Sequence, residues 1–463
     1  MLFFYMCTIL VLLNSCITYT SVVNIRLELP LIADSESIIT YKGYTDIEYG
    51  DNTIIVTDKP LPSVPYLDWD EEGKCFHSSM IGSYSKVPSD SFVTLDSGWY
   101  VLDSNISPKS ITVNGTVSNP TRIVLCDGYT LTGRIIVLKD NALIIYAQST
   151  DETTMGKIVA NTFMTGTAGI GGVYNGDESP DDAYCGTITI NGGNIEATGG
   201  WNGAGIGGGV GGTGGIVTIN GGIVNATASG AGAGVGGGKG GAGGTLIING
   251  GIVTATGDDC GAGIGGGEDG TGGTVTINGG IVKATGGMYG AGIGGGNLAS
   301  GGTVTITGGK VEAIAREDGN GKGGAGIGAG SEGTGGTLKL SEDCDFKAQG
   351  LIAVSGLLEK VGTFSSKCFT PGDGKTFLTF DEYKDSLETY PKITLAVPTY
   401  CIVIFDTNGG TQVQPRQVIS GRKVVQPMAP TKSGCEFVSW VTQAGVVYDF
   451  DIPVTSDITL YAK

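Results

Sequence analysis

The chain of 463 residues carries 45 Asp and Glu against 27 Lys and Arg, a formal net charge of −18. So acidic a chain is repelled by nucleic acid and by anionic membrane surfaces, and charge therefore excludes both as partners. Its 84 glycines would indicate disorder if they were scattered, but they recur at a fixed interval, which indicates a repeat architecture.

The chain begins with an uncharged apolar run, residues 2–13, followed by small and polar residues. The run is too short to cross a bilayer and is typical of a secretory signal peptide, which we place at residues 1–20. Leu13 to Cys16 is similar to a lipoprotein cleavage site, so lipid attachment at Cys16 is an alternative to simple secretion. No later run is long enough for a membrane span. The sequence therefore predicts an extracellular or cell-surface protein.

Residues 21–62 contain short alternating segments, such as 37–41 and 53–57, and lead into a proline-rich stretch at 59–65. This pattern predicts an N-terminal β segment and a linker. The strands expected between residues 66 and 160 are longer and bulkier, as terminal coils of a solenoid must be to close its open edge.

Two phrases alternate between residues 167 and 340. A phrase such as Val275-Thr-Ile-Asn-Gly-Gly280 is followed by one such as Gly290-Ala-Gly-Ile-Gly-Gly-Gly296, and the four central units repeat every 29 residues. Alternate residues are aliphatic, which predicts three short strands per unit, each with one apolar face that only stacking can bury. We therefore predict an all-β fold, a single-stranded parallel β-helix over residues 63–398. Its internal columns are expected at Ile190, Ile219, Ile248, Ile277 and Ile306, and at Ile206, Val235, Ile264, Ile293 and Ile327.

Asparagine stands at one corner of successive units, at Asn191, Asn220, Asn249 and Asn278. Asparagine tolerates left-handed backbone and bonds along a stack, so we expect a hydrogen-bonded ladder there. Residues 342–398 are expected to close the far end, with one short helix near residues 380–387.

The last segment, residues 400–463, opens with Phe405-Asp-Thr-Asn-Gly-Gly410 and closes with Asp457-Ile-Thr-Leu-Tyr-Ala462. In this order the motifs resemble the Listeria–Bacteroides repeat, the internalin-type B repeat. The resemblance implies a small β-grasp-like fold on a secreted or surface-attached protein, often an adhesin, and no catalysis. Cys435, Ser439 and the terminal Lys463 depart from the family pattern. Residues 66–340 likewise resemble Gly-rich β-helical regions found beside such repeats in predicted surface proteins.

Pectin lyases and polygalacturonases use the β-helix fold and place charged groups of adjacent coils in one groove. The outward column expected here is mixed in charge, so we assign no catalytic residue and expect no enzyme; it comprises Glu196, Asn225, Thr254, Lys283 and Glu312. The alternative is a polysaccharide lyase or glycoside hydrolase in which Asp103, Asp127 and Asp140 gather on the irregular coils.

No cofactor motif is present, because the Gly-x-Gly-x-x-Gly matches follow from glycine content and no helix is expected after them. No Cys or His spacing fits zinc, so no metal site is expected. The acidic residues at 177–182 are interpreted as a solvated loop, with calcium binding as the alternative.

The Gly-rich phrase is expected to present an outer face without side chains, a smooth strip that a protein or a flat sugar ring could approach. The candidate ligand-binding residues stand beside it: Trp201, Asn202, Met288 and Tyr289. Aromatic rings stack on sugar faces, but they can equally fold over the strip to protect it. We predict a non-catalytic protein for adhesion or for binding glycans, matrix or host surface proteins.

Eight cysteines follow the signal segment without a shared spacing, so disulfides and buried free thiols both stay open. Three Asn-x-Ser/Thr sequences are candidate glycosylation acceptors, at Asn105, Asn114 and Asn225.

Overall fold

The computed structural model describes residues 46–50, 53–57, 63–174, 176, 180–364, 366–371 and 376–463. The expected signal peptide, Cys16 and segment 37–41 lie outside these residues. The chain divides into two compact units, residues 1–64 with 80–83, and residues 65–79 with 84–463. In the first unit, β1 (Asp46–Gly50) and β2 (Thr53–Thr57) form an antiparallel hairpin. Among the described residues, no helix combines the length and the apolarity that a membrane crossing requires.

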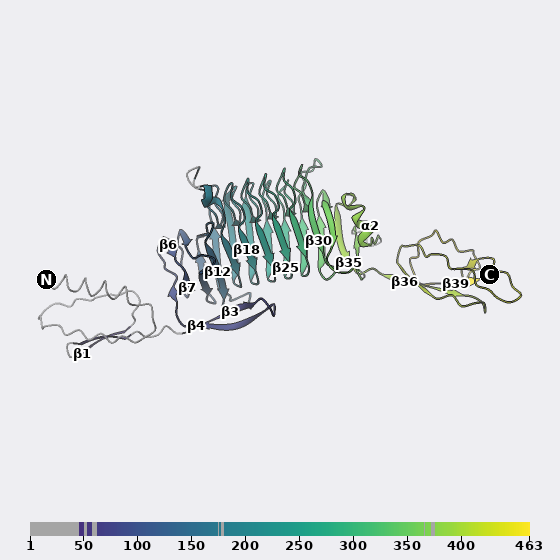
Figure 1. Ribbon diagram of the computed structural model, residues 1–463, viewed down its shortest axis with the longest axis horizontal. Helices are drawn as coiled ribbons and strands as arrows, with labels where there is room; N and C mark the ends of the chain where they lie inside the picture. Colours follow the sequence, from purple (N-terminus) through teal and green to yellow (C-terminus); the bar gives the residue numbers. More distant parts are fainter. Residues whose placement is uncertain are drawn as a thin grey trace. The chain divides into compact units, whose positions relative to one another are not determined.

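Most of the second unit is a stack of coils, and each coil adds one short strand to each of three sheets (Figure 1). Sheet 1 comprises β5 (Ser85–Lys86), β7 (Gly98–Leu102), β9 (Thr121–Leu125), β12 (Ala142–Ala147), β15 (Thr187–Ile190), β18 (Ile216–Ile219), β21 (Thr245–Ile248), β24 (Thr274–Ile277), β27 (Thr303–Ile306), β30 (Gly336–Leu340) and β33 (Gly356–Lys360). All of its strand pairs are parallel.

Sheets 2 and 3 are also parallel, except for the last two strands of sheet 2, β35 and β34, which are added in antiparallel pairs. Sheet 2 comprises β10 (Thr130–Thr132), β13 (Lys157–Asn161), β16 (Asn194–Trp201), β19 (Ile223–Ser229), β22 (Ile252–Thr256), β25 (Ile281–Thr285), β28 (Lys310–Ile314), β31 (Asp345–Gln349), β35 (Lys392–Ala396) and β34 (Cys368–Thr370). Sheet 3 comprises β6 (Phe92–Leu95), β8 (Ser110–Val113), β11 (Arg134–Ile136), β14 (Ile170–Gly171), β17 (Ile206–Gly207), β20 (Val235–Gly236), β23 (Ile264–Gly265), β26 (Ile293–Gly294), β29 (Ala325–Gly328) and β32 (Ile352–Val354).

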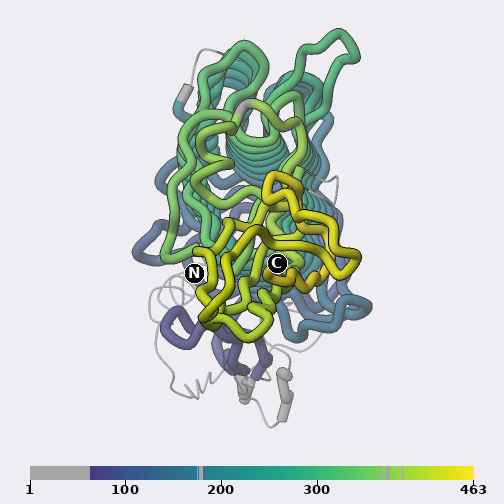
Figure 2. The backbone as a smooth tube through the Cα atoms, turned by 90° about the vertical axis from the view of Figure 1, so that its right-hand side faces the viewer, coloured from purple at the N-terminus to yellow at the C-terminus, as the bar shows by residue number. Residues whose placement is uncertain are grey.

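The aliphatic columns lie inside the stack, as the sequence predicts. In sheet 1 the register joins Ile190, Ile219, Ile248, Ile277 and Ile306 in one row, and each is 0% exposed. The sheet 3 row from Ile206 to Ile327 is equally buried. Viewed along the stack, the coils of the repeat region overlie one another (Figure 2). The protein is therefore an all-β, parallel β-helix in its repeat region.

The asparagine ladder forms, but the asparagines do not take the left-handed backbone expected of them. The second glycine of each corner does so instead, for example Gly222 at φ +85°, because glycine has no Cβ to clash there. Each asparagine is left to bond along the stack: Asn220 Nδ2 donates to Asn191 Oδ1 (2.8 Å), and Asn249 Nδ2 donates to Asn220 Oδ1 (2.8 Å).

Asn220→Ala should lower the free energy of unfolding by about 2–3 kcal/mol, because it removes two hydrogen bonds and leaves the buried Asn191 amide oxygen without this donor. Asn278→Ala is the matched control, since that rung is exposed and should cost about 1 kcal/mol or less. Urea titration of both variants measures the difference. Equal losses would show that burial does not set the strength of the ladder.

A hairpin that the sequence analysis did not predict covers the outer face of sheet 1 at the first coils. β3 (Val64–Asp70) pairs with β4 (Cys75–Ile81), and the hairpin runs along the stack (Figure 1). The Tyr66 ring lies 4.9 Å from the rings of both Trp99 and Tyr146. Further along, the Phe76 ring packs against Gly221, where a Cβ would stand 2.6 Å from it.

The far end of the stack is closed by β35, which pairs with β31, and by β34, which pairs with β35; both pairs are antiparallel. The expected helix is shorter than residues 380–387: α2 (Phe380–Lys384) begins at a capping box formed by Thr379 and Glu382. Two 3₁₀ turns, η1 (Pro180–Ala183) and η2 (Leu387–Thr389), complete the helical content of the described residues.

The C-terminal module is a four-stranded sheet in the order β37-β36-β39-β38. Its strands are β36 (Tyr400–Asp406), β37 (Arg416–Ile419), β38 (Trp440–Val441) and β39 (Ile458–Ala462). The two central strands, β36 and β39, are parallel and the outer pairs antiparallel, as in a β-grasp sheet.

Candidate functional site

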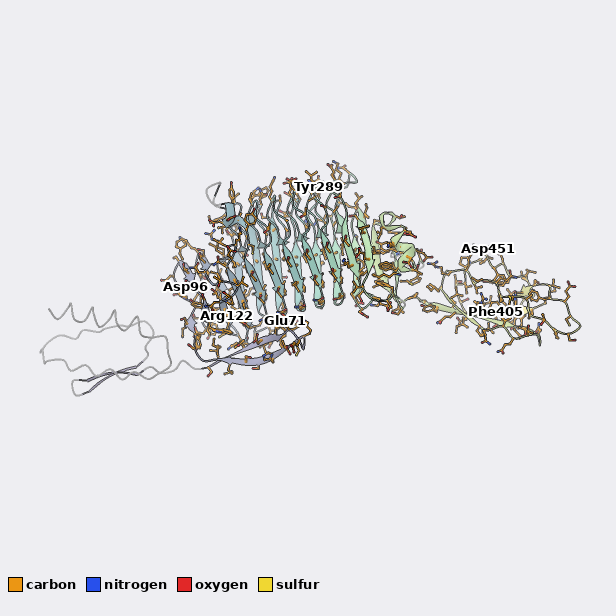
Figure 3. The ribbon with its side chains drawn as sticks, in the orientation of Figure 1. Glu71, Asp96, Arg122, Tyr289, Phe405 and Asp451 are labelled. Atoms are coloured by element: carbon orange, nitrogen blue, oxygen red, sulfur yellow. The ribbon has the colours of Figure 1, made fainter. Side chains whose placement is uncertain are left out.

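The candidate residues lie on one edge of the stack, where turns lead from sheet 2 into sheet 3. Turns from sheet 3 into sheet 1 hydrogen-bond to these turns, for example through Lys239 N, which donates to Asn202 O (2.9 Å). We call the surface formed by both sets of turns the loop edge; Tyr289 marks it in Figure 3. Trp201 and Met288 occupy equivalent positions in units that repeat every 29 residues, three coils apart. Coils are spaced about 4.8 Å apart, so the two positions are separated by about 14 Å. The fold thus places Trp201 and Asn202 in line with Met288 and Tyr289 but does not bring the two pairs into contact.

The smooth strip expected beside these residues does not exist as a surface. The Gly-rich phrase 203–209 is buried, and its glycines are required by close packing between coils. A Cβ on Gly207 would stand 1.9 Å from the carbonyl oxygen of Gly236 in the next coil. The expectation was wrong because the side of the phrase without side chains faces neighbouring backbone, not solvent.

Trp201 and Asn202 serve the stack as well as the surface. The Trp201 ring packs over Gly230 of the next coil, 3.1 Å from where a Cβ would be, yet 54% of the residue stays exposed. Asn202 Oδ1 accepts the backbone N–H of Ala231 (3.0 Å), which holds the turn in place. The exposed face of the indole is therefore the group at this position that can meet a ligand.

Met288 and Tyr289 form the second end of the edge. Met288 is 41% exposed, and the backbone of Tyr289 is fixed by hydrogen bonds to both neighbouring coils. Its N–H donates to Asp259 O (3.0 Å), and its carbonyl accepts from Ser331 N (2.7 Å). The half-buried Tyr289 ring is thus presented from a rigid turn.

Four exposed apolar residues that the sequence analysis did not select extend both ends of this edge: Phe163, Met164, Tyr174 and Leu298. Gly166 N donates to Trp201 O (2.7 Å), and the Tyr174 ring packs against Gly166, so Tyr174 and Trp201 flank one glycine. Tyr174 occupies the position that Val210 and Lys239 take in later coils, and aligning the longer first unit with the others could have found it.

The middle of the edge is small and acidic. Asp258 Oδ2 accepts the N–H of Gly230 (3.0 Å), and Lys239 pairs with Glu268 (2.6 Å). Burial, reinforced by Glu268 and Asp259, raises the pKa of the Cys260 thiol to about 11, so it is not a reactive thiolate at neutral pH. The edge therefore has aromatic ends and a negatively charged centre, which favours a neutral ligand over a polyanion.

The outward column of sheet 2 is aligned as expected, from Glu196 to Glu312. Its carboxylates are paired with lysines: Lys157 lies 2.6 Å from Glu196, and the Lys347 ammonium bonded to Glu312 lowers the pKa of that carboxyl. Two carboxylates on adjacent coils, the arrangement that general acid and base chemistry requires, do not occur in this column.

The three aspartates of the enzymatic alternative do not gather. Asp103 and Asp127 follow the adjacent strands β7 and β9, so they share one corner, where Lys86 pairs with Asp103 (2.8 Å). Asp140 follows β11 of sheet 3 with left-handed backbone (φ +72°), at another corner. Among the residues described, no group of three His, Cys, Asp or Glu side chains could hold a metal ion; Asp177 and Glu178 lie outside them.

All eight cysteines from Cys75 to Cys435 are free thiols, and five are buried, including Cys126. Of the candidate glycosylation sites, Asn105 and Asn114 are exposed, and Asn225 faces outward on β19, half-buried. Asn105 Oδ1 accepts Thr130 N (2.7 Å), and Asn114 Nδ2 donates to Asp96 Oδ1 (3.1 Å).

Comparison with known families supports both parts of this architecture. Residues 188–210, 217–239, 246–268 and 275–297 match the model of the beta helix repeat, and residues 402–463 match the Listeria-Bacteroides repeat domain. The repeat region is thus a β-helix of a recognised type. The C-terminal module is a Listeria–Bacteroides repeat, as its motifs indicate. No curated protein and no solved structure gives a significant match.

Both repeats are typical of extracellular or surface proteins. Beta-helix repeats occur in lyases and hydrolases as well as in non-catalytic proteins, so the fold does not decide between these classes. Each matched β-helix segment runs from a strand of sheet 1 to the loop edge, and the first and last contain the candidate binding residues.

Proposed function

We propose that this is a secreted or surface-displayed, non-catalytic protein that binds glycans or matrix through the loop edge. The observation that carries the proposal is a pair of ring positions, the exposed Trp201 and the half-buried Tyr289, held on turns of coils three apart in the stack. Three coils rise by about 14 Å along the stack, which is the reach of a short run of pyranose rings, because one coil rises by about the length of one sugar. Such a ligand would lie along the edge and stack at both ends.

The centre of the edge narrows the class of glycan. Asp258, Asp259 and Glu268 would repel uronate or sulfate groups, and the protein as a whole is acidic. A neutral, extended polysaccharide is therefore the ligand we propose. The Trp201 ring would contribute the stacking contact at the first end, and Tyr289 with Met288 the contact at the other.

Trp201→Ala and Tyr289→Ala should each weaken binding of a neutral polysaccharide by about tenfold, since a stacked ring contributes about 1.5 kcal/mol. A glycan array finds the ligand, and calorimetry with the full chain measures the change. Tyr129→Ala is the control, because that tyrosine is 39% exposed but lies between β9 and β10, away from the loop edge.

Two results would contradict the proposal. Loss of binding in Tyr129→Ala as large as in the edge variants would place the ligand elsewhere. Release of unsaturated or reducing ends from a polysaccharide would show catalysis and favour the lyase or hydrolase alternative.

A further inference from the structure

One face of the C-terminal sheet carries an exposed row of apolar side chains on its central strand. Along the central strand β36, residues alternate between exposed and buried. The exposed set is Tyr400 (40%), Ile402 (45%), Ile404 (45%) and, at the end of the strand, Asp406. On the same face, Ile419 of β37 lies directly beside Tyr400, the exposed Gln417 of β37 beside Ile402, and Thr459 of β39 beside Ile404. A central strand with a row of bulky apolar side chains in water is unusual for a soluble module.

The module's own core is on the opposite face. Val403, Phe405, Trp440 and Leu460 are at most 4% exposed and form one cluster with Val424. The segment that follows β37 covers this inner face, where a β-grasp would place its helix. No element within residues 400–463 covers the outer row, so it is open to a partner.

The charge of the module permits contact with a second copy of this chain. Residues 400–463 contain five basic residues, Arg416, Arg422, Lys423, Lys432 and Lys463, and five acidic residues, Asp406, Glu436, Asp449, Asp451 and Asp457. The module is therefore neutral, and the whole charge of −18 resides in the rest of the chain. Self-repulsion opposes contact between two copies everywhere except through this module.

We propose that the C-terminal module pairs with the same module of a second copy, sheet face against sheet face, about a two-fold axis at Ile402. In this isologous arrangement Ile402 meets Ile402, and Tyr400 of each copy meets Ile404 of the other. Asp406, four residues beyond Ile402, lies about 14 Å from the axis. The two Asp406 carboxylates are then about 27 Å apart at opposite rims and stay solvated.

The contact is small. A strand of seven residues is about 24 Å long and four strands span about 19 Å, so the face buries at most about 450 Å² per copy. Weak, transient interfaces have this size. The dimeric fraction is thus small in dilute solution and becomes large where many copies share one surface.

Sedimentation velocity of the full chain, from micromolar to near-millimolar concentration, tests the proposal. We expect a monomer–dimer equilibrium that strengthens with added salt, because salt screens the repulsion between acidic chains and leaves an apolar contact intact. Ile402→Lys should weaken dimerisation at least about tenfold. Ile402→Asp should do the same, and mixing the two variants should restore pairing, since opposite charges then meet at the axis.

Met428→Lys and Ile216→Lys are the controls, because both side chains are exposed and apolar but lie off this sheet face, at 90% and 48% exposure. Both should dimerise like the unmodified chain. Circular dichroism should show native strand content in every variant, since the substituted positions are on the surface. A chain that stays monomeric throughout, or a dimer insensitive to Ile402→Lys, would overturn the proposal. Dimerisation does not depend on glycan binding, so either proposal can fail while the other holds.

Discussion

Gly207→Ala should destabilise the repeat region by on the order of 3–5 kcal/mol, although it adds only one methyl group. Two effects act together. Gly207 has φ +137°, a conformation that residues with a Cβ rarely adopt, and the new Cβ would stand 1.9 Å from Gly236 O. The obstacle is backbone of the next coil, which cannot rotate away as a side chain would. Urea unfolding followed by far-ultraviolet circular dichroism measures the loss.

Gly211→Ala separates the two effects. Gly211 is in the same coil and also has positive φ (+76°), but nothing lies within 4 Å of its hypothetical Cβ. Its left-handed conformation should cost about 1–2 kcal/mol on its own. If Gly207→Ala proved no worse than Gly211→Ala, the close approach between coils would not be the reason for glycine at that position.

The interval of 29 residues and its period-two alternation predict the β-helix because they report burial directly. Ile248 and Ile277 recur at the interval since each must lie over its equivalent inside the stack. The Listeria–Bacteroides motifs likewise predict the C-terminal module. In both cases the pattern lies within short stretches of the chain, so it can be recognised in a single sequence.

Features that depend on contacts between distant segments could not be predicted. The hairpin β3–β4 holds its place through Tyr66 against Trp99 and Tyr146, residues 33 and 80 positions away that share no repeat with it. The loop edge shows the same limit, since Tyr174 and Trp201 are brought together through Gly166, a contact between coils that no repeat in the sequence marks. Period two also cannot tell whether the side of a glycine phrase that lacks side chains faces solvent or neighbouring backbone.

The coil geometry links the proposed site to the stack. Sheet columns repeat with small changes because each strand must fit its neighbours, whereas the turn at the loop edge differs from coil to coil: Trp201, Gly230, Asp259 and Met288 occupy the same position. The buried sheet columns thus fix the backbone conformation, whereas the side chains at the loop edge differ from coil to coil. A ligand that spans several coils therefore meets different side chains at a constant spacing of about 4.8 Å.

Ile277→Asp should abolish folding of the central coils at neutral pH. Ile277 is 0% exposed and lies between Ile248 and Ile306, so the substitution places a carboxylate where no donor or counter-ion is within the column. We expect a loss above about 5 kcal/mol, from the lost burial and from the charge that cannot be solvated. Each coil contacts only its neighbours, so the defect also separates the two halves of the stack.

Ile281→Asp is the matched control, four residues away in the same coil and 51% exposed. It should change the free energy of unfolding by no more than about 0.5 kcal/mol. The pH dependence provides a second readout. Burial raises the pKa of the introduced carboxyl in the folded state, so the folded state binds the extra proton as pH falls, and the deficit of Ile277→Asp should shrink towards pH 4. A deficit independent of pH would mean that lost packing, not buried charge, causes the failure.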